Sequence, residues 1–174
     1  MNFPAHPSIV RACGLLCGSA LMLAAAGPAQ AGCAGVGVFA CSATVSVPLP
    51  LSFGSYNPGS PKPGATNISV TGTVTGVGVL VTLSYAISLS AGTGGSITNR
   101  ALAGPGTPLS YNLYTADTYQ AIWGNNGRSD SYSLVASVGG VSQTMNYTVY
   151  GLIPAGQYVA AGNYTDTITV SVVY

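Results

Sequence analysis

Apolar and polar side chains alternate along most of the chain with a period of two residues. The clearest stretch covers residues 77–89, where every second position is apolar: Val77, Val79, Val81, Leu83, Tyr85, Ile87 and Leu89. This period points successive side chains to opposite faces of a β-strand, so we expect one face to be buried and the other to be polar. A stretch of this length exceeds the usual strand, which predicts a bend or a bulge near residues 76–78.

Shorter stretches of the same kind occur along the chain, and no segment shows the apolar spacing of an amphipathic helix. Further strands are predicted at residues 45–51, 68–74, 109–114, 119–123, 132–138, 144–152 and 164–174. The first contains Pro48 and Pro50, which cannot donate to a strand ladder, so it should be an edge or bulged strand. Between later strands, Gly139-Gly140 is typical of a two-residue hairpin turn. The pattern predicts an all-β fold, an antiparallel β-sandwich.

Charged residues make up only 4% of the sequence, against about 25% in an ordinary soluble domain. So few cations cannot neutralise a phosphate backbone, and we expect no nucleic-acid partner. The single histidine is His6, and no histidine follows residue 31 to activate a serine or cysteine nucleophile. Asp117, Asp130 and Asp166 are expected to cap turns or pair with arginines. We therefore predict no catalytic residue, no metal site, no cofactor and no enzymatic activity.

Residues 1–31 have the composition of a secretory signal. One positive charge precedes an apolar run at residues 13–26, which is too short to span a bilayer as an anchor. An Ala-Gln-Ala sequence ending at Ala31 matches the small-x-small pattern of a cleavage site. We predict cleavage after Ala31, which leaves a mature domain at residues 32–174 without a transmembrane segment. A lipid-modified Cys17 is the weaker alternative.

Two cysteines, Cys33 and Cys41, remain in the predicted mature chain. Because an exported chain meets an oxidising compartment, a bond between them is expected to close a small glycine-rich loop. Intermolecular pairing and free thiols are the alternatives that the spacing leaves open.

The C-terminal stretch is a strong strand with no later strand to cover its far edge. Ile168, Val170 and Val172 alternate with hydroxyl side chains, and the sequence ends at Tyr174. An uncovered strand edge is a template for pairing with another chain. A strand supplied by a partner would gain main-chain hydrogen bonds and would fill pockets with alternate side chains.

Three blocks of sequence resemble the spore coat protein U domain family, which includes subunits of archaic chaperone–usher pili. The blocks are residues 51–58 (LSFGSYNP), residues 100–127 (RALAGPGTPLSYNLYTADTYQAIWGNNG) and residues 149–174 (VYGLIPAGQYVAAGNYTDTITVSVVY). The third block is the most specific. Tyr-Gly, Pro-x-Gly-Gln, Gly-x-Tyr-x-Asp-Thr and a terminal Tyr occur there in order, at the family's spacing.

The resemblance implies an immunoglobulin-like β-sandwich that lacks its last strand. A periplasmic chaperone lends the strand, an outer-membrane usher follows in assembly, and the N-terminal segment of another pilus subunit replaces the strand. Carried onto this sequence, the acceptor groove would involve Ile168, Val170, Val172 and Tyr174. The donor segment would use Val36 and Val38.

The implied function is a secreted structural subunit of a pilus or fimbria on a Gram-negative bacterium, serving adhesion and biofilm formation. The chain departs from the family at Gly72, where many members have a cysteine that pairs with the counterpart of Cys41; Cys33 is then the remaining partner. A spore or cell-surface coat protein is one alternative function. A carbohydrate-binding module that uses Trp123 and nearby tyrosines is another, because aromatic rings stack on sugars, although core packing is the commoner role of such residues.

Overall fold

The computed structural model describes residues 32–125 and 127–174, so the predicted signal and its cleavage site after Ala31 lie outside the described residues. Over the described part, the chain forms strands and no helix. The strands are β1 (Gly32–Ser46), β2 (Lys62–Leu89), β3 (Arg100–Leu102), β4 (Leu109–Tyr114), β5 (Arg128–Ala136), β6 (Val141–Ile153) and β7 (Val170–Val173). Every pairing between these strands is antiparallel, which confirms the predicted all-β, antiparallel class.

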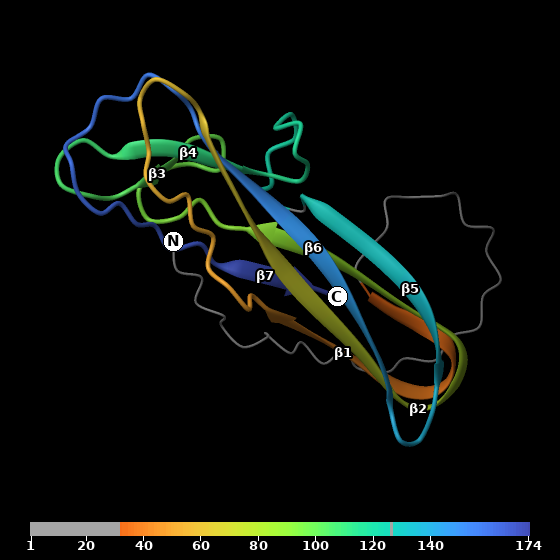
Figure 1. The fold of residues 1–174 in the computed structure, drawn as a ribbon. Helices are drawn as coiled ribbons and strands as arrows, with labels where there is room; N and C mark the ends of the chain where they lie inside the picture. The colour runs from red at the N-terminus through yellow and green to blue at the C-terminus, as the bar shows by residue number, and fades with distance from the viewer. Residues whose placement is uncertain (1–31, 126) are drawn as a thin grey trace.

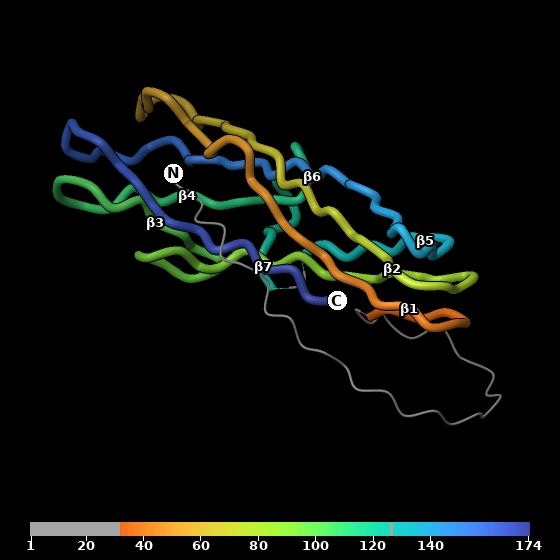
Figure 2. The backbone as a smooth tube through the Cα atoms, turned by 90° about the horizontal axis from the view of Figure 1, so that it is seen from below, coloured from red at the N-terminus to blue at the C-terminus, as the bar shows by residue number. Residues whose placement is uncertain are grey.

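The 28-residue strand β2 lies at the centre of the fold, and four other strands pair with it. Along one edge of β2, its first part pairs with β6 and its second part with β5. Along the other edge, β1 pairs with its middle and β7 with its end. The β1–β2 ribbon turns back on itself near Gly76 and Leu80, whose φ angles are 110° and 53°. The two halves of β2 therefore lie in two layers (Figures 1 and 2), and the bend predicted near residues 76–78 is confirmed.

The layers enclose one main core and a small second cluster at the bend. Side chains from both halves of β2 meet those of β4, β6, β7 and the loops in the main core, which includes Ile68, Val70, Leu83, Ile87, Leu113, Trp123, Val149, Ile153 and Ile168. The second cluster consists of Val74, Val81 and Ala136, with Phe39, Cys41 and Leu134 packed against it. Each layer thus buries one face, as the period of two requires.

Residues 77–89 do not bury one face throughout, contrary to the prediction. The pairing of β2 with β5 shifts register between Gly78 and Val81, so one extra residue reverses the direction in which odd-numbered side chains point. Val81 is buried as a result, whereas Val77 and Val79 are 65% and 55% exposed.

Two predicted strands have other bounds in the structure, and a third does not form. The first strand is β1, which stops at Ser46, so residues 47–51 with their two prolines lie outside any strand. Residues 119–123 form no strand, because Tyr119 has a φ angle of 53° and only Ile122 makes an isolated bridge, to Tyr114. The last strand is shorter than predicted and begins at Val170.

Candidate functional site

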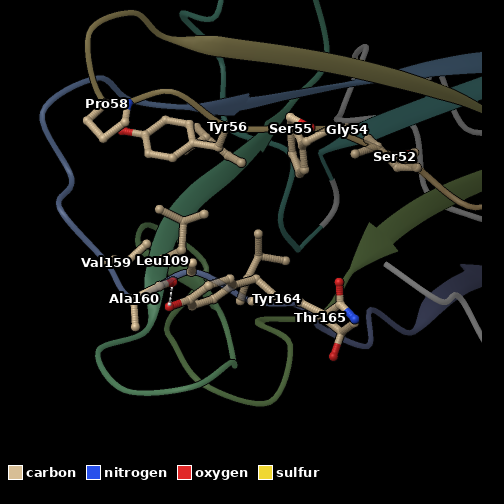
Figure 3. Close-up of a pocket in the computed structure, with 17 residues that line it drawn as sticks. Ser52, Gly54, Ser55, Tyr56, Pro58, Leu109, Val159, Ala160, Tyr164 and Thr165 are labelled. Atoms are coloured by element: carbon tan, nitrogen blue, oxygen red, sulfur yellow. Dashed lines mark hydrogen bonds between the residues drawn. The ribbon is translucent and has the colours of Figure 1, made fainter.

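A groove of about 820 Å³ is lined by the segments that precede β2 and β7 and by residues of β3, β4 and β6. These segments lie at the end of the fold away from the β1–β2 bend (Figure 1). The walls of the groove are two segments outside the strands, residues 51–58 before β2 and residues 159–165 before β7. Figure 3 shows Tyr56 and Tyr164 projecting from these opposite walls. The groove therefore separates two segments that are far apart in the sequence.

The floor of the groove is the hydrophobic core itself. Its buried side chains are Leu51, Leu102, Leu109 and Ile153. Phe53, Val159 and Tyr164 are half-buried and pack against the same core from the walls. Among the residues that the structure describes, no charged one lines the groove. An occupant would therefore bury apolar surface there, without an ion pair to orient it.

The backbone of both walls has few partners within the described part of the chain. Residues 51–55 form no backbone hydrogen bond there, because Pro48 and Pro50 precede them and β1 has already ended. On the other wall, the Ala160 carbonyl accepts a bond from the Tyr164 hydroxyl (2.9 Å), and Thr165 pairs with Ala103. Unpaired backbone groups beside an apolar floor are what an added strand requires.

Side-chain hydrogen bonds hold the first wall in place. The Tyr56 hydroxyl donates to the Pro154 carbonyl (2.7 Å) and accepts from the backbone N–H of Gln157 (3.1 Å). The Gln157 side chain in turn bonds both backbone groups of Ser110 on β4, at 2.7 and 2.9 Å. The wall is thus fixed to the sheet, so the groove is formed before anything binds in it.

A buried carboxylate holds the second wall where it continues toward β7. Asp166 accepts hydrogen bonds from the Tyr111 hydroxyl (2.6 Å) and from the backbone and side chain of Thr93 (2.8 and 2.7 Å). Burial, together with the bond to Asp166, raises the pKa of Tyr111 above its usual value, so this hydroxyl remains a donor. The role of Asp166 is therefore to cap the turn at Thr93, one of the two roles expected for it.

The predicted acceptor residues lie on β7, which continues the second wall, or directly beside it: Val170 and Val172 belong to the strand, Ile168 precedes it and Tyr174 follows it. Ile168 and Val170 are 0% and 4% exposed and are part of the core, whereas Val172 and Tyr174 are half-buried against it. β7 pairs with the end of β2 along one edge, and no described strand covers its other edge. These four side chains thus face inward beside an uncovered edge, beyond the groove.

Sequence reasoning missed the residues that line the groove, above all Leu51, Phe53, Val159 and Tyr164. The available signal was the resemblance itself, since its first and third blocks contain the two walls. Alternation could not reveal them, because the walls are irregular and only a few of their side chains reach the core.

The predicted donor segment belongs to β1 and pairs with the second half of β2. Val36 and Val38 lie opposite Val79 and Val77 and are 68% and 86% exposed. Cys33 and Cys41 are joined in a disulfide with their Cα atoms 6.1 Å apart, which confirms the intramolecular bond. At Gly72 a side chain would collide with the Tyr132 hydroxyl, so the phenol fills the space that a side chain at this position would take.

Trp123 is fully buried, and its indole N–H donates to the Ile87 carbonyl at 3.0 Å. A buried ring cannot stack on a sugar, so the carbohydrate-binding alternative loses its central residue.

The other two aspartates do not converge on a common site. Asp117 is exposed, whereas Asp130 accepts a bond from the Tyr147 hydroxyl (2.9 Å). Within the described ranges, no three His, Cys, Asp or Glu residues are grouped to hold a metal ion. Among the same residues, no helix has the length and apolar character needed to cross a membrane.

The fold and the groove define a class of protein: a curled antiparallel β-sheet in two layers, with an uncharged groove between two unpaired segments. The profile of the Spore Coat Protein U domain matches residues 23–171. The chain belongs to the Spore Coat Protein U domain family. A comparison with curated protein sequences found no significant match.

Two solved structures show similarity at low identity. One is the CsuC–CsuE chaperone–tip adhesion subunit pre-assembly complex from the archaic chaperone–usher Csu pili of Acinetobacter baumannii. It shares 17% identity and a TM-score of 0.47, over 78% of this chain and 40% of that chain. The other is a chaperone–tip adhesin complex related to the biogenesis of CFA/I fimbriae, with 13% identity and a TM-score of 0.42, over 75% and 41% of the two chains. The chain thus spans about two fifths of the length of these matches.

Proposed function

We propose that this protein is a structural, non-enzymatic subunit of a bacterial surface pilus or fimbria and that its groove receives a β-strand from another polypeptide. The observation that carries the proposal is the groove, whose apolar floor lies between two segments with unpaired backbone groups. Membership of the Spore Coat Protein U domain family supports it, because the resemblance to that family implies a subunit of an archaic chaperone–usher pilus.

The inserted strand would run between residues 51–58 and residues 159–165 and would continue along the uncovered edge of β7. Its alternate side chains would contact Leu51, Phe53 and Tyr164, and its backbone would bond both walls. Three or four buried aliphatic side chains contribute about 1.5–3 kcal/mol each, so the complex would persist without a covalent bond.

The route to the cell surface follows from this role. The chain would be exported with its signal and held in the periplasm by a chaperone that lends the strand. It would then pass an outer-membrane usher and join other subunits on the surface of a Gram-negative cell. Adhesion and biofilm formation are the functions that such a filament would serve.

A synthetic peptide tests the groove directly. A 13-residue peptide that alternates valine or isoleucine with threonine should raise the melting temperature of the exported, purified protein. At a hundredfold excess over Kd, binding adds about 2.7 kcal/mol to the free energy of unfolding. A peptide of the same composition without the alternation should have no effect, because it cannot point its apolar side chains to one face. Equal stabilisation by both peptides would contradict the proposal.

A pair of neighbouring substitutions locates the binding site. Val159→Arg places a charge on the groove wall and should weaken binding of the alternating peptide at least about tenfold, since burying an unpaired charge is costly. Tyr158→Arg is the matched control, because Tyr158 is 87% exposed and does not line the groove. Unchanged affinity in both variants would place the peptide elsewhere on the protein.

A further inference from the structure

We propose that the Cys33–Cys41 disulfide fastens the N-terminal segment, residues 32–40, to its own domain, so that the oxidised chain accepts a strand but cannot donate one. This inference rests on the proposed function, because it concerns which end of a strand-exchange filament the chain can occupy. It is carried by the path of β1, by two of its glycines and by the position of the bond.

The disulfide is incompatible with an extended donor strand. Cys33 and Cys41 are eight residues apart, and an extended strand would separate their Cα atoms by about 26 Å at ~3.3 Å per residue. The bond instead holds these atoms 6.1 Å apart, because β1 bends together with β2 and brings the two cysteines face to face across the layers. A strand given to another domain must be extended so that alternate side chains point the same way.

Local sequence is adapted to the bent path. Gly37 and Gly76 have φ angles of 135° and 110°, which side-chain-bearing residues rarely adopt. A Cβ at Gly37 would collide with the Val77 carbonyl, and one at Gly76 would collide with the Val38 carbonyl. The two strands can therefore approach closely around the bend only because both positions are glycine.

Side-chain packing alone holds this segment weakly. Val36 and Val38, the side chains that would fill a neighbour's groove, point to solvent, and Phe39 is the segment's main contact with the small cluster at the bend. Apolar burial therefore contributes little to keeping residues 32–40 in place. They are held by backbone pairing with residues 75–84 of β2 and, covalently, by the disulfide. Strand pairing can be exchanged for pairing with another domain, whereas a covalent bond cannot, so breaking the disulfide should allow the segment to leave β2 and extend.

The consequence concerns filament growth. Head-to-tail assembly needs each copy to present one strand and one groove, and it continues until a copy lacks one of them. With the bond closed, as expected in an oxidising compartment, this chain offers only its groove and ends the filament. With the bond open it offers both and can take an internal position.

The test compares three samples of the exported protein by analytical ultracentrifugation: wild type, wild type treated with a phosphine reductant, and the Cys33→Ser/Cys41→Ser variant. Oxidised wild type should sediment as a single chain. The reduced protein and the double variant should shift to multiples of that mass, and adding Val159→Arg to the double variant should abolish the shift by blocking the groove. Reduced wild type gives the same information if the double variant folds poorly.

Two results would overturn the proposal. One is that wild type with an intact disulfide assembles to the same extent as the double variant. Failure to react with maleimide would show that the disulfide of that sample is intact. The other is a single-chain mass for both disulfide-free samples at every concentration. Binding of the alternating peptide distinguishes failure of this inference from failure of the proposed function. If the peptide binds and the disulfide-free samples do not assemble, only this inference fails. If the peptide does not bind either, the proposed function fails as well.

Discussion

Replacing Arg100 by methionine is expected to lower the free energy of unfolding by about 3–5 kcal/mol. Arg100 is 0% exposed, and its guanidinium donates to four backbone carbonyls and one side chain. The acceptors are Ser90 O (2.9 Å), Ile97 O (3.3 Å), Asn112 Oδ1 (2.7 Å), Leu89 O (3.2 Å) and Trp123 O (2.8 Å). Methionine keeps the apolar stem but leaves these buried acceptors without a donor, and that desolvation is the source of the loss.

Urea denaturation measures this effect, and the matched control is Arg128→Met. Arg128 is exposed. Among the described residues its side chain donates one long bond, to the Thr115 carbonyl at 3.4 Å, and its guanidinium lies 5.3 Å from the centre of the Tyr147 ring, so its replacement should lower stability by no more than about 1 kcal/mol. Burial lowers the pKa of Arg100, while the nearby Tyr111 and Asp166 oppose that shift. Equal stability of the two variants would show that the hydrogen bonds donated by Arg100 do not stabilise the fold.

Trp123→Ala should also lower the free energy of unfolding by about 3–5 kcal/mol, because it removes the largest fully buried side chain of the core and leaves a cavity. It also removes the indole donor to the Ile87 carbonyl, in the second layer of β2. Thermal unfolding followed by circular dichroism checks the loss, and Tyr158→Ala, at an 87% exposed tyrosine, should leave the transition almost unchanged. A Trp123→Ala variant that unfolds like wild type would show that the ring is not part of the core.

The sequence allowed the fold class and much of the core to be predicted because both depend on local alternation. Residues 109–114 were predicted as a strand and form β4, and Trp123 was favoured as a core residue and is fully buried. A two-residue hairpin turn was predicted at Gly139-Gly140, and a turn does join β5 and β6 there, but the bond from the Gly140 N–H to the Ser137 carbonyl (2.9 Å) makes Val138 and Gly139 its central residues. In each case the information lies within a few residues of the feature.

The errors share a different physical cause, since they depend on contacts between distant segments. Residues 47–51 form no strand because their two prolines cannot donate hydrogen bonds to a neighbouring strand. Val77 is exposed because the pairing of β2 with β5 shifts register just after it. The groove depends on two irregular segments, more than 100 residues apart in the chain, that meet above the core. Neither segment has a periodic pattern of apolar residues from which their proximity could be predicted.

If the groove accepts a strand and the disulfide restrains the donor segment, as proposed, the two ends of the molecule have different roles. The groove lies between the segments around Tyr56 and Tyr164, whereas Cys33 and Cys41 bridge the layers toward the β1–β2 bend. Strand acceptance and strand donation would therefore be controlled separately, the first by the apolar floor and the second by the redox state of two cysteines.

Amide hydrogen exchange of the groove walls tests the central claim most directly. In the free protein, the amides of residues 51–55 and residues 159–164 should exchange fast, because no described backbone hydrogen bond protects them. Bound to the alternating peptide, both walls should exchange much more slowly, while the β5–β6 turn at Gly140 should not change. Walls that are already protected in the free protein, or that stay unprotected with the peptide bound, would contradict an open sandwich completed by a strand from another chain.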